Sequence, residues 1–157
     1  MDTLSVSDIN KKYSEYISGR ISKLSETLYN GYKHTKKGWY EFKKFKPLFY
    51  RSSWELKVCE LLDTKFSSII TNIETPEPIP YILNEQRHSY FCDFKITFNN
   101  NKILYIEVKP LHKMDTDMNR AKLKEAKLVW GKNFMVATEN EIFSNELEKN
   151  ILKYYND

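Results

Sequence analysis

The sequence predicts an α/β fold, in which a mixed β-sheet is flanked by helices and preceded by a helical arm. From residue 53 onward, the apolar patterns follow the order helix, strand, strand, strand, helix, strand, helix. The polar stretch "NNNK" between the second and third strands makes them an antiparallel hairpin. The helix between the third and fourth strands is a crossover, which favours parallel pairing and so a mixed sheet. With 157 residues, of which 41% are hydrophobic, the chain suits one domain with a real core.

The N-terminal part divides into an arm and a connector. Over residues 7–30, isoleucine, leucine and tyrosine recur at three- and four-residue steps, which predicts an amphipathic helix that ends at Asn30-Gly31. This helix can pack on the main fold or pair with a second copy to form a homodimer. We therefore divide the chain into the arm at 1–31, a basic and aromatic connector at 32–50, and the main domain at 51–157.

The elements of the main domain follow from apolar periodicity and from residues that break it. The three prolines of "ETPEPIPYIL" exclude a central strand but leave an edge strand, and "NEQRH" is expected to be a turn. Gly131 ends the helix that precedes the last strand. The predicted elements are a helix at about 53–64, an edge strand near 79–83, strands at 89–98 and 103–110, a helix from Asp115 or Thr116 to about Trp130, a strand at 133–138 and a helix at 144–155.

The connector holds the positive excess of the chain. Residues 33–51 have a formal charge of +6, while the whole chain has +4. Aromatic residues lie among these lysines, and a nucleic-acid surface needs both phosphate contacts and aromatic faces. The alternative is a solvated linker whose aromatic side chains pack on the core. The residues that we expect to contact double-stranded DNA are Lys36, Lys37, Lys43, Lys44, Lys46 and Arg51.

Several classes of protein are disfavoured by the sequence. Cys59 and Cys92 have no CxxC spacing and no histidine at ligand spacing, which argues against a structural zinc site. No apolar run approaches the roughly 18–20 residues that cross a membrane. The N-terminus "MDTLSVSDIN" is acidic and polar, unlike a signal peptide. We expect an intracellular, cytoplasmic protein with no membrane partner.

Two strands carry charges among apolar neighbours. Asp93 and Glu107 lie on the two arms of the predicted hairpin, with the turn near their midpoint, so they can approach each other. Two close carboxylates repel unless a cation lies between them, and a hard cation such as Mg²⁺ suits oxygen ligands. Lys109 lies two residues after Glu107 and so faces the same side of the strand. Each residue alone also fits a structural salt bridge, but the combination favours a metal-dependent phosphodiesterase site.

Glu55 has both a structural and a functional explanation. Ser52-x-x-Glu55 matches a capping box, which accounts for both residues. The helix also precedes the strands, so its N-terminal end can overlie the carboxylate pair and bring Glu55 to the site. Arg51 is a natural phosphate contact beside it. His88 and His112 are interpreted as solvated loop residues.

At these residues the sequence resembles the PD-(D/E)XK nuclease superfamily, from Tyr50 to about Ile142. "YRSSWELKVCELLD" is similar to the acidic helix of a phage and mobile-element branch. "PIPYI" and "RHSYFCDFKITF" are similar to its first two strands, and "ILYIEVKP" to the Glu-x-Lys strand. Cys92 is a departure, because the family has proline before the aspartate. That position shapes the strand rather than taking part in the chemistry.

The resemblance implies a restriction-endonuclease-like core and a metal-dependent DNA endonuclease. Asp93, Glu107, the backbone carbonyl of Val108 and Glu55 would hold Mg²⁺, for which Mn²⁺ would substitute. The catalytic residues would be Glu55, Asp93, Glu107 and Lys109. Hydrolysis would leave a 3′-hydroxyl and a 5′-phosphate.

The similarity to this branch leaves three alternatives for the biological role of the protein. "GYKHTKKGWYEFKKFKPLFYRSSWE" is similar to the lead-in of phage homing endonucleases, and later segments are equally similar to phage head-completion nucleases and transposon end-cleaving subunits. We expect a homing or mobile-element nuclease in a phage-infected bacterium. A non-catalytic DNA-binding or virion-assembly protein on the same fold is the alternative from another class.

Overall fold

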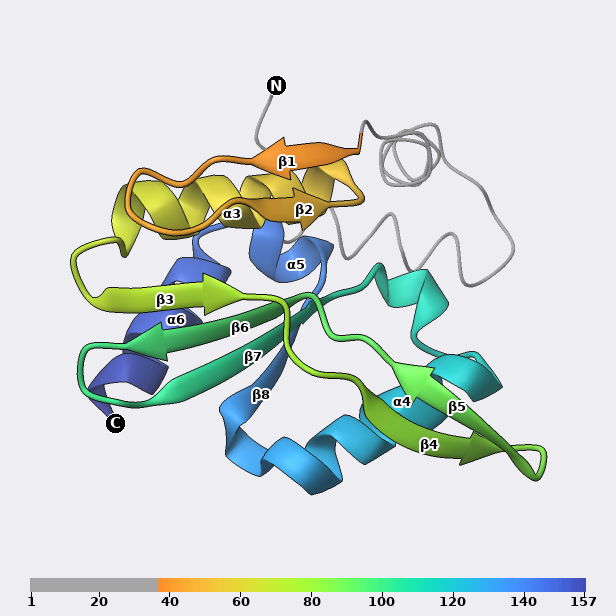
Figure 1. The fold of residues 1–157 in the computed structure, drawn as a ribbon. Coiled ribbons are helices and arrows are strands. Elements are labelled where there is room, and N and C mark those ends of the chain that lie inside the picture. The colour runs from red at the N-terminus through yellow and green to blue at the C-terminus, as the bar shows by residue number, and fades with distance from the viewer. Residues whose placement is uncertain (1–36) are drawn as a thin grey trace.

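A computed structural model of the protein describes residues 37–157 (Figure 1). The predicted arm at 1–31, with its helix over 7–30, lies outside the described residues, as does Lys36. The described part combines helices with β-sheets, which confirms the α/β class.

A four-stranded mixed sheet forms the centre of the molecule. Its strands are β3 (Ile70–Glu74), β6 (Phe94–Phe98), β7 (Ile103–Val108) and β8 (Phe134–Ala137), in the order β3-β6-β7-β8. The first two pairs are antiparallel, whereas β7 and β8 are parallel. Helix α4 (Asp117–Trp130) makes the crossover between β7 and β8, so the mixed sheet was predicted correctly.

Two hairpins lie outside this sheet. One pairs β1 (Gly38–Tyr40) with β2 (Leu48–Tyr50), within the segment predicted to be a connector. The other pairs β4 (Ile79–Leu83) with β5 (Gln86–Tyr90). The predicted strand near 79–83 therefore exists, but it pairs only with β5 and not with the central sheet.

Three details of the predicted order were wrong. "NEQRH" is not wholly a turn. Of these five residues, Asn84 and Glu85 have positive φ and make the turn, whereas the other three pair in β5. The predicted strand at 89–98 is divided into β5 and β6 by residues 91–93. Strand β3 was not predicted, because a register shift between Ile70 and Asn72 removes the two-residue alternation that marks a strand.

Helices cover both faces of the central sheet (Figure 1). Helices α3 (Ser53–Lys65), α5 (Glu139–Ile142) and α6 (Glu146–Asn156) contribute to one hydrophobic cluster together with the inward residues of β6 and β7. Helix α4 and the β4–β5 hairpin form a second cluster on the other face. Within residues 37–157, no helix is both long enough and apolar enough to cross a membrane.

Short turns of 3₁₀ helix complete the described chain. One covers Leu111–Lys113, directly after β7, and the other covers Gly131–Asn133, between α4 and β8. Helix α4 begins after Thr116, whose side chain accepts a hydrogen bond from the backbone N–H of Asn119 at 3.1 Å. This N-cap fixes where the first turn of α4 lies relative to the end of β7.

Candidate active site

The N-terminal end of α3 supplies the first carboxylate of the site. Ser52 caps the helix by accepting a hydrogen bond from the backbone N–H of Glu55 at 3.1 Å. The Glu55 carboxylate in turn accepts from the Ser52 hydroxyl at 3.1 Å and from the Arg51 N–H at 3.3 Å. The Ser52 half of the predicted capping box is therefore present, whereas the Glu55 carboxylate accepts from the N–H of Arg51 and the Ser52 hydroxyl rather than from the N–H of Ser52. Glu55 is only 8% exposed.

Asp93 lies in the break between β5 and β6, where it leaves the strand pairing but remains against the sheet. Its Oδ2 accepts a hydrogen bond from the backbone N–H of Val108 at 2.8 Å. The observed pairs of β6 and β7 include Phe94 with Ile106, and the same register places Asp93 opposite Glu107. The predicted approach of the two carboxylates across the hairpin follows from this register.

Glu107 lies one residue before the end of β7, with its carboxylate inside the protein. It is 4% exposed. Its Oε1 accepts a hydrogen bond from the hydroxyl of Tyr90 at 2.8 Å, and its Oε2 lies 3.3 Å from the Lys109 ammonium. One oxygen is thus held by a neutral donor from β5 and the other by a cation directly after the end of β7.

Lys109 is held in place by both its backbone and its side chain. Its N–H donates to the carbonyl of Ala137 at the end of β8 at 3.0 Å, and its ammonium donates to Asn119 Oδ1 at 3.5 Å. Asn119 is itself oriented by donating to the carbonyl of Lys113 at 2.6 Å. The first turn of α4 therefore directs the Lys109 ammonium toward Glu107.

Burial and neighbouring negative charge raise the pKa of two of the three carboxylates, those of Asp93 and Glu55. Burial, followed by the charges of Glu107 and Glu55, raises the pKa of Asp93 well above its usual value. Burial also raises the pKa of Glu55, to which the charge of Glu107 adds, against hydrogen bonds from Arg51 and Ser52. Burial lowers the pKa of Lys122, and the charge of Lys109 lowers it further. Carboxylates that repel in this way are stabilised in their charged form by a cation.

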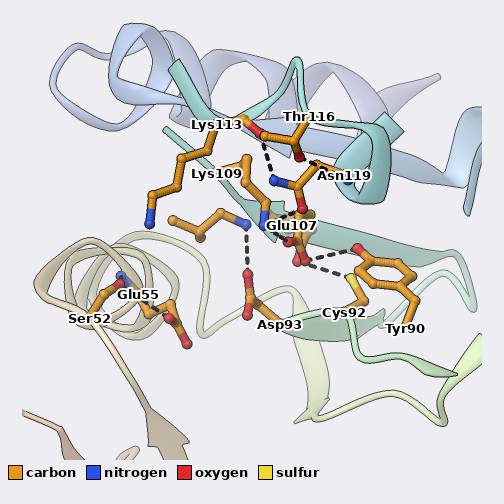
Figure 2. A network of polar contacts seen from close by, with 12 residues as sticks. Ser52, Glu55, Tyr90, Cys92, Asp93, Glu107, Lys109, Lys113, Thr116 and Asn119 are labelled. Carbon is orange, nitrogen blue, oxygen red and sulfur yellow. Dashed lines mark hydrogen bonds and ion pairs between the residues drawn. The ribbon is translucent and has the colours of Figure 1, made fainter. Parts of the chain in front are cut away.

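These side chains line one pocket of about 380 Å³. Figure 2 shows Glu55 reaching in from α3, whereas Asp93, Glu107 and Lys109 reach in from the β6–β7 hairpin and its ends. The pocket thus brings together all four residues predicted to be catalytic, together with Val108. Its basic lining residues are Lys37, Arg51, Lys109, Lys113 and Lys122.

The predicted DNA-binding residues divide into two groups. Lys37 and Arg51 line the pocket. Lys43, Lys44 and Lys46 are exposed on the loop between β1 and β2, outside the lining of this pocket. The backbone N–H of Lys43 donates to Asp63 at 3.3 Å, which places this loop at the C-terminal end of α3.

The donor set suits a hard cation. Among residues 37–157, no three side chains of histidine, cysteine, aspartate or glutamate form a ready metal-binding group. The predicted set instead combines the carboxylates of Asp93 and Glu107 with a backbone carbonyl, that of Val108. Burial, and then the charges of Glu107 and Glu55, raise the pKa of Asp93 well above its usual value. Carboxylate and carbonyl oxygens are the donors that Mg²⁺ prefers, so these residues fit the ion.

Sequence reasoning missed the residues that orient the site. Tyr90 and Asn119 hold Glu107 and Lys109 through contacts between elements distant in the sequence, and no local pattern marks such contacts. Lys122 follows Asn119 by three residues on α4, so helical spacing could have found it once Asn119 was known. His88 stacks on Tyr81 in the β4–β5 hairpin, with ring centroids 5.3 Å apart, and is not among the residues lining the pocket.

Comparison with known proteins adds no family to this geometry. No protein-family model matches the chain, and the curated proteins give no significant match to it.

Proposed function

We propose that the protein is a DNA endonuclease that hydrolyses phosphodiester bonds with Mg²⁺, for which Mn²⁺ substitutes. The observation that supports this proposal is the meeting of three acidic residues and Lys109 in one pocket edged by further cations. A carboxylate cluster alone suits many functions. The added basic lining residues favour a polyanionic substrate such as DNA.

The acidic residues hold the cation in this proposal. Asp93, Glu107 and the carbonyl of Val108 are its ligands, and Glu55 supplements them. The bound cation supplies positive charge that activates the attacking water and neutralises the phosphate. Tyr90 fixes the direction of the Glu107 carboxylate by its hydrogen bond at 2.8 Å. The N–H of Val108 does the same for Asp93.

The basic residues act on the substrate. The Lys109 ammonium, 3.3 Å from Glu107, is positioned to stabilise charge that develops on the phosphate during attack. Asn119 keeps the lysine at that position. Arg51 and Lys37 line the same pocket and hold the phosphates on either side of the bond that is cut.

Nicking of supercoiled plasmid tests this function. Wild-type protein with Mg²⁺ is expected to relax the plasmid, and excess EDTA should abolish the reaction. Glu107→Gln should not nick, while retaining DNA binding in a gel shift. Binding without nicking by the wild-type protein would instead favour a non-catalytic DNA-binding protein of virion assembly.

The biological setting rests on the resemblance of the sequence. We place the protein among phage homing or mobile-element nucleases, with head completion as the alternative. Mapping the breaks that the protein makes in phage and host genomes distinguishes them. A homing nuclease should cut one or a few sites, whereas a head-completion nuclease should show little dependence on sequence.

A further inference from the structure

Phe91 is an exposed aromatic residue at the candidate active site. It is 64% exposed, while its neighbours Tyr90 and Cys92 are 2% and 1% exposed. Phe91 lines the same pocket as Asp93 and Glu107. Burying a phenylalanine side chain removes a large apolar area from water, which is favourable. The exposure of Phe91 next to the reactive groups leaves an aromatic face available to a ligand in this pocket.

The backbone around Phe91 is held on both sides. The Tyr90 hydroxyl donates to Glu107 at 2.8 Å, and the Cys92 thiol donates to the carbonyl of Ile106 at 3.2 Å. Both anchors attach residues 90–92 to β7. Turning the ring of Phe91 into the core would require one of these buried neighbours to leave its place. The ring is thus presented outward by the same contacts that orient Glu107.

The charges around Phe91 indicate what its ring meets. Lys37, Arg51, Lys113 and Lys122 line the pocket with it, so a phosphate backbone that enters the pocket passes the ring. The part of a nucleotide that an aromatic ring contacts favourably is the face of its base. In a paired duplex these faces are covered by the neighbouring base pairs. An unpaired nucleotide offers its face without the cost of unstacking.

We propose that Phe91 stacks on the base of an unpaired nucleotide beside the phosphate that is cut. The preferred substrate is then DNA with unpaired nucleotides at the cleavage position, such as a flap, a bulge or a frayed end. This inference rests on the proposed nuclease function and assigns the substrate class of the same site. Phe91 is a specificity residue in this assignment, and the acidic residues and Lys109 remain the catalytic groups.

Fluorescence of 2-aminopurine measures the stacking without cleavage. The probe is a duplex with a short unpaired bulge that contains 2-aminopurine, and the protein is the Glu107→Gln variant, which should bind without cutting. Stacking on Phe91 should quench the probe. Adding Phe91→Leu, which retains apolar bulk without the ring, should abolish most of the quenching, whereas adding Phe91→Tyr should preserve it.

Cleavage rates give the second measurement. Wild-type protein should cut the bulged duplex faster than the paired duplex of the same sequence, by about 5-fold to 150-fold, the range that base stacking on an aromatic ring supplies. Phe91→Leu should bring this ratio close to one. Ile82→Ala is the matched control, because Ile82 is 65% exposed on β4 and lies outside the pocket. It should leave the ratio unchanged.

The outcomes separate this inference from the proposed function. Quenching that survives in Phe91→Leu, or equal cleavage of bulged and paired duplexes by the wild type, would overturn the inference. Plasmid nicking with no quenching would keep the nuclease and reject the stacking. Quenching that depends on Phe91, in a protein that cuts no DNA, would support stacking and reject the nuclease.

Discussion

The two ends of α3 each hold a buried carboxylate, but in opposite surroundings. At the C-terminal end, Asp63 is 4% exposed and accepts hydrogen bonds from the Tyr40 hydroxyl at 2.8 Å and the Lys43 N–H at 3.3 Å. At the N-terminal end, Glu55 accepts from the Arg51 N–H and from the Ser52 hydroxyl. Each carboxylate has two donors. Hydrogen bonding alone therefore does not distinguish the two ends.

The difference lies in the neighbouring charges. Burial raises the pKa of both Asp93 and Glu55; the charges of Glu107 and Glu55 add to the shift of Asp93, and the charge of Glu107 adds to that of Glu55. At the other end, Asp63 joins the β1–β2 hairpin to α3 through Tyr40 and Lys43. Three buried carboxylates that face one another repel, so this arrangement does not by itself stabilise the fold. The comparison supports the proposal that the Glu55 end binds a ligand, whereas Asp63 links the β1–β2 hairpin to α3.

The basic residues divide along the same helix. Lys37 and Arg51 line the pocket at the Glu55 end, whereas the Lys43 backbone lies at the Asp63 end. Glu55 and Asp63 are eight positions apart on α3, which is a distance of about 12 Å along the helix axis at the usual rise per residue. The connector is therefore two surfaces, one at the candidate site and one beyond it. A single basic patch, as expected from the sequence, is too simple a description.

The largest expected effect comes from removing one of the facing carboxylates. Asp93→Asn and Glu107→Gln should each lower the cleavage rate by more than about a hundredfold, because losing a metal ligand should cost more activity than losing a residue that only orients one. Without metal, Asp93→Asn should melt at a higher temperature than the wild type, since the repulsion among the acids is reduced. Calorimetry in EDTA beside plasmid nicking measures both changes.

Added Mg²⁺ sharpens this test. The cation should raise the melting temperature of the wild type by binding the folded state, and it should have little effect on Asp93→Asn. Asp63→Asn is the matched control at the other end of α3. It should lower stability and leave the Mg²⁺ response intact. An equal Mg²⁺ response in the wild type and Asp93→Asn would remove Asp93 from the metal site.

Glu55 itself separates helix capping from catalysis. Glu55→Gln keeps an oxygen that accepts hydrogen bonds but loses the charge, so we expect a rate that falls by orders of magnitude with a modest change in stability. Ser52→Ala removes the cap instead. It should lower the free energy of unfolding by about 0.5–2 kcal/mol and leave the rate per folded molecule near normal. A stable and fully active Glu55→Gln would restrict Glu55 to its capping role.

The sequence predicted the parts of the fold that depend on local pattern. Helix α3 was expected at about 53–64 and covers Ser53–Lys65, and Thr116 caps α4 as one of the two expected residues. Strand β3 was missed because its bulge hides the alternation. The pairing of β4 with β5 away from the central sheet was missed for another reason. Partner choice among strands depends on packing over the whole domain, which a local pattern does not encode.

The approach of Asp93 to Glu107 could be predicted because the register of the hairpin could be predicted. A turn centred near Asn100 places Asp93 and Glu107 opposite each other, and the observed pair of Phe94 with Ile106 has the same centre. The approach of Glu55 required only that the preceding helix pack near the hairpin end. Tyr90 and Asn119 could not be found in this way, because each belongs to an element whose position is fixed by tertiary packing.

A smaller effect is expected for the two basic surfaces. Lys37→Gln should flatten the slope of log affinity against log salt by about 0.9, the value for one duplex phosphate contact, and should also lower kcat because it lines the pocket. The double variant Lys43→Gln with Lys44→Gln should flatten the slope by up to about twice as much, at an unchanged kcat. Binding to duplexes over a range of salt, with single-turnover rates at saturating DNA, measures both. A reduced kcat in the double variant would contradict the separation of the two surfaces.

The smallest expected effect concerns the structural end of α3. Burial, followed by the hydrogen bond to Asp63 and its charge, raises the pKa of Tyr40 from 10.0 to about 12. Between pH 10 and about 12 the folded protein holds a proton that the unfolded chain has lost, so stability falls as the pH rises through this window. Below that window the contribution is complete. Tyr40→Phe has no such proton, so its stability should fall less over the same window, as measured by urea unfolding.

The contribution of the Tyr40–Asp63 contact is small because Tyr40 is partly exposed and solvent screens the pair. Parallel pH profiles for the two proteins would show that the Tyr40–Asp63 contact adds nothing to stability, and the contrast between the two ends of α3 would then rest on the acidic cluster alone.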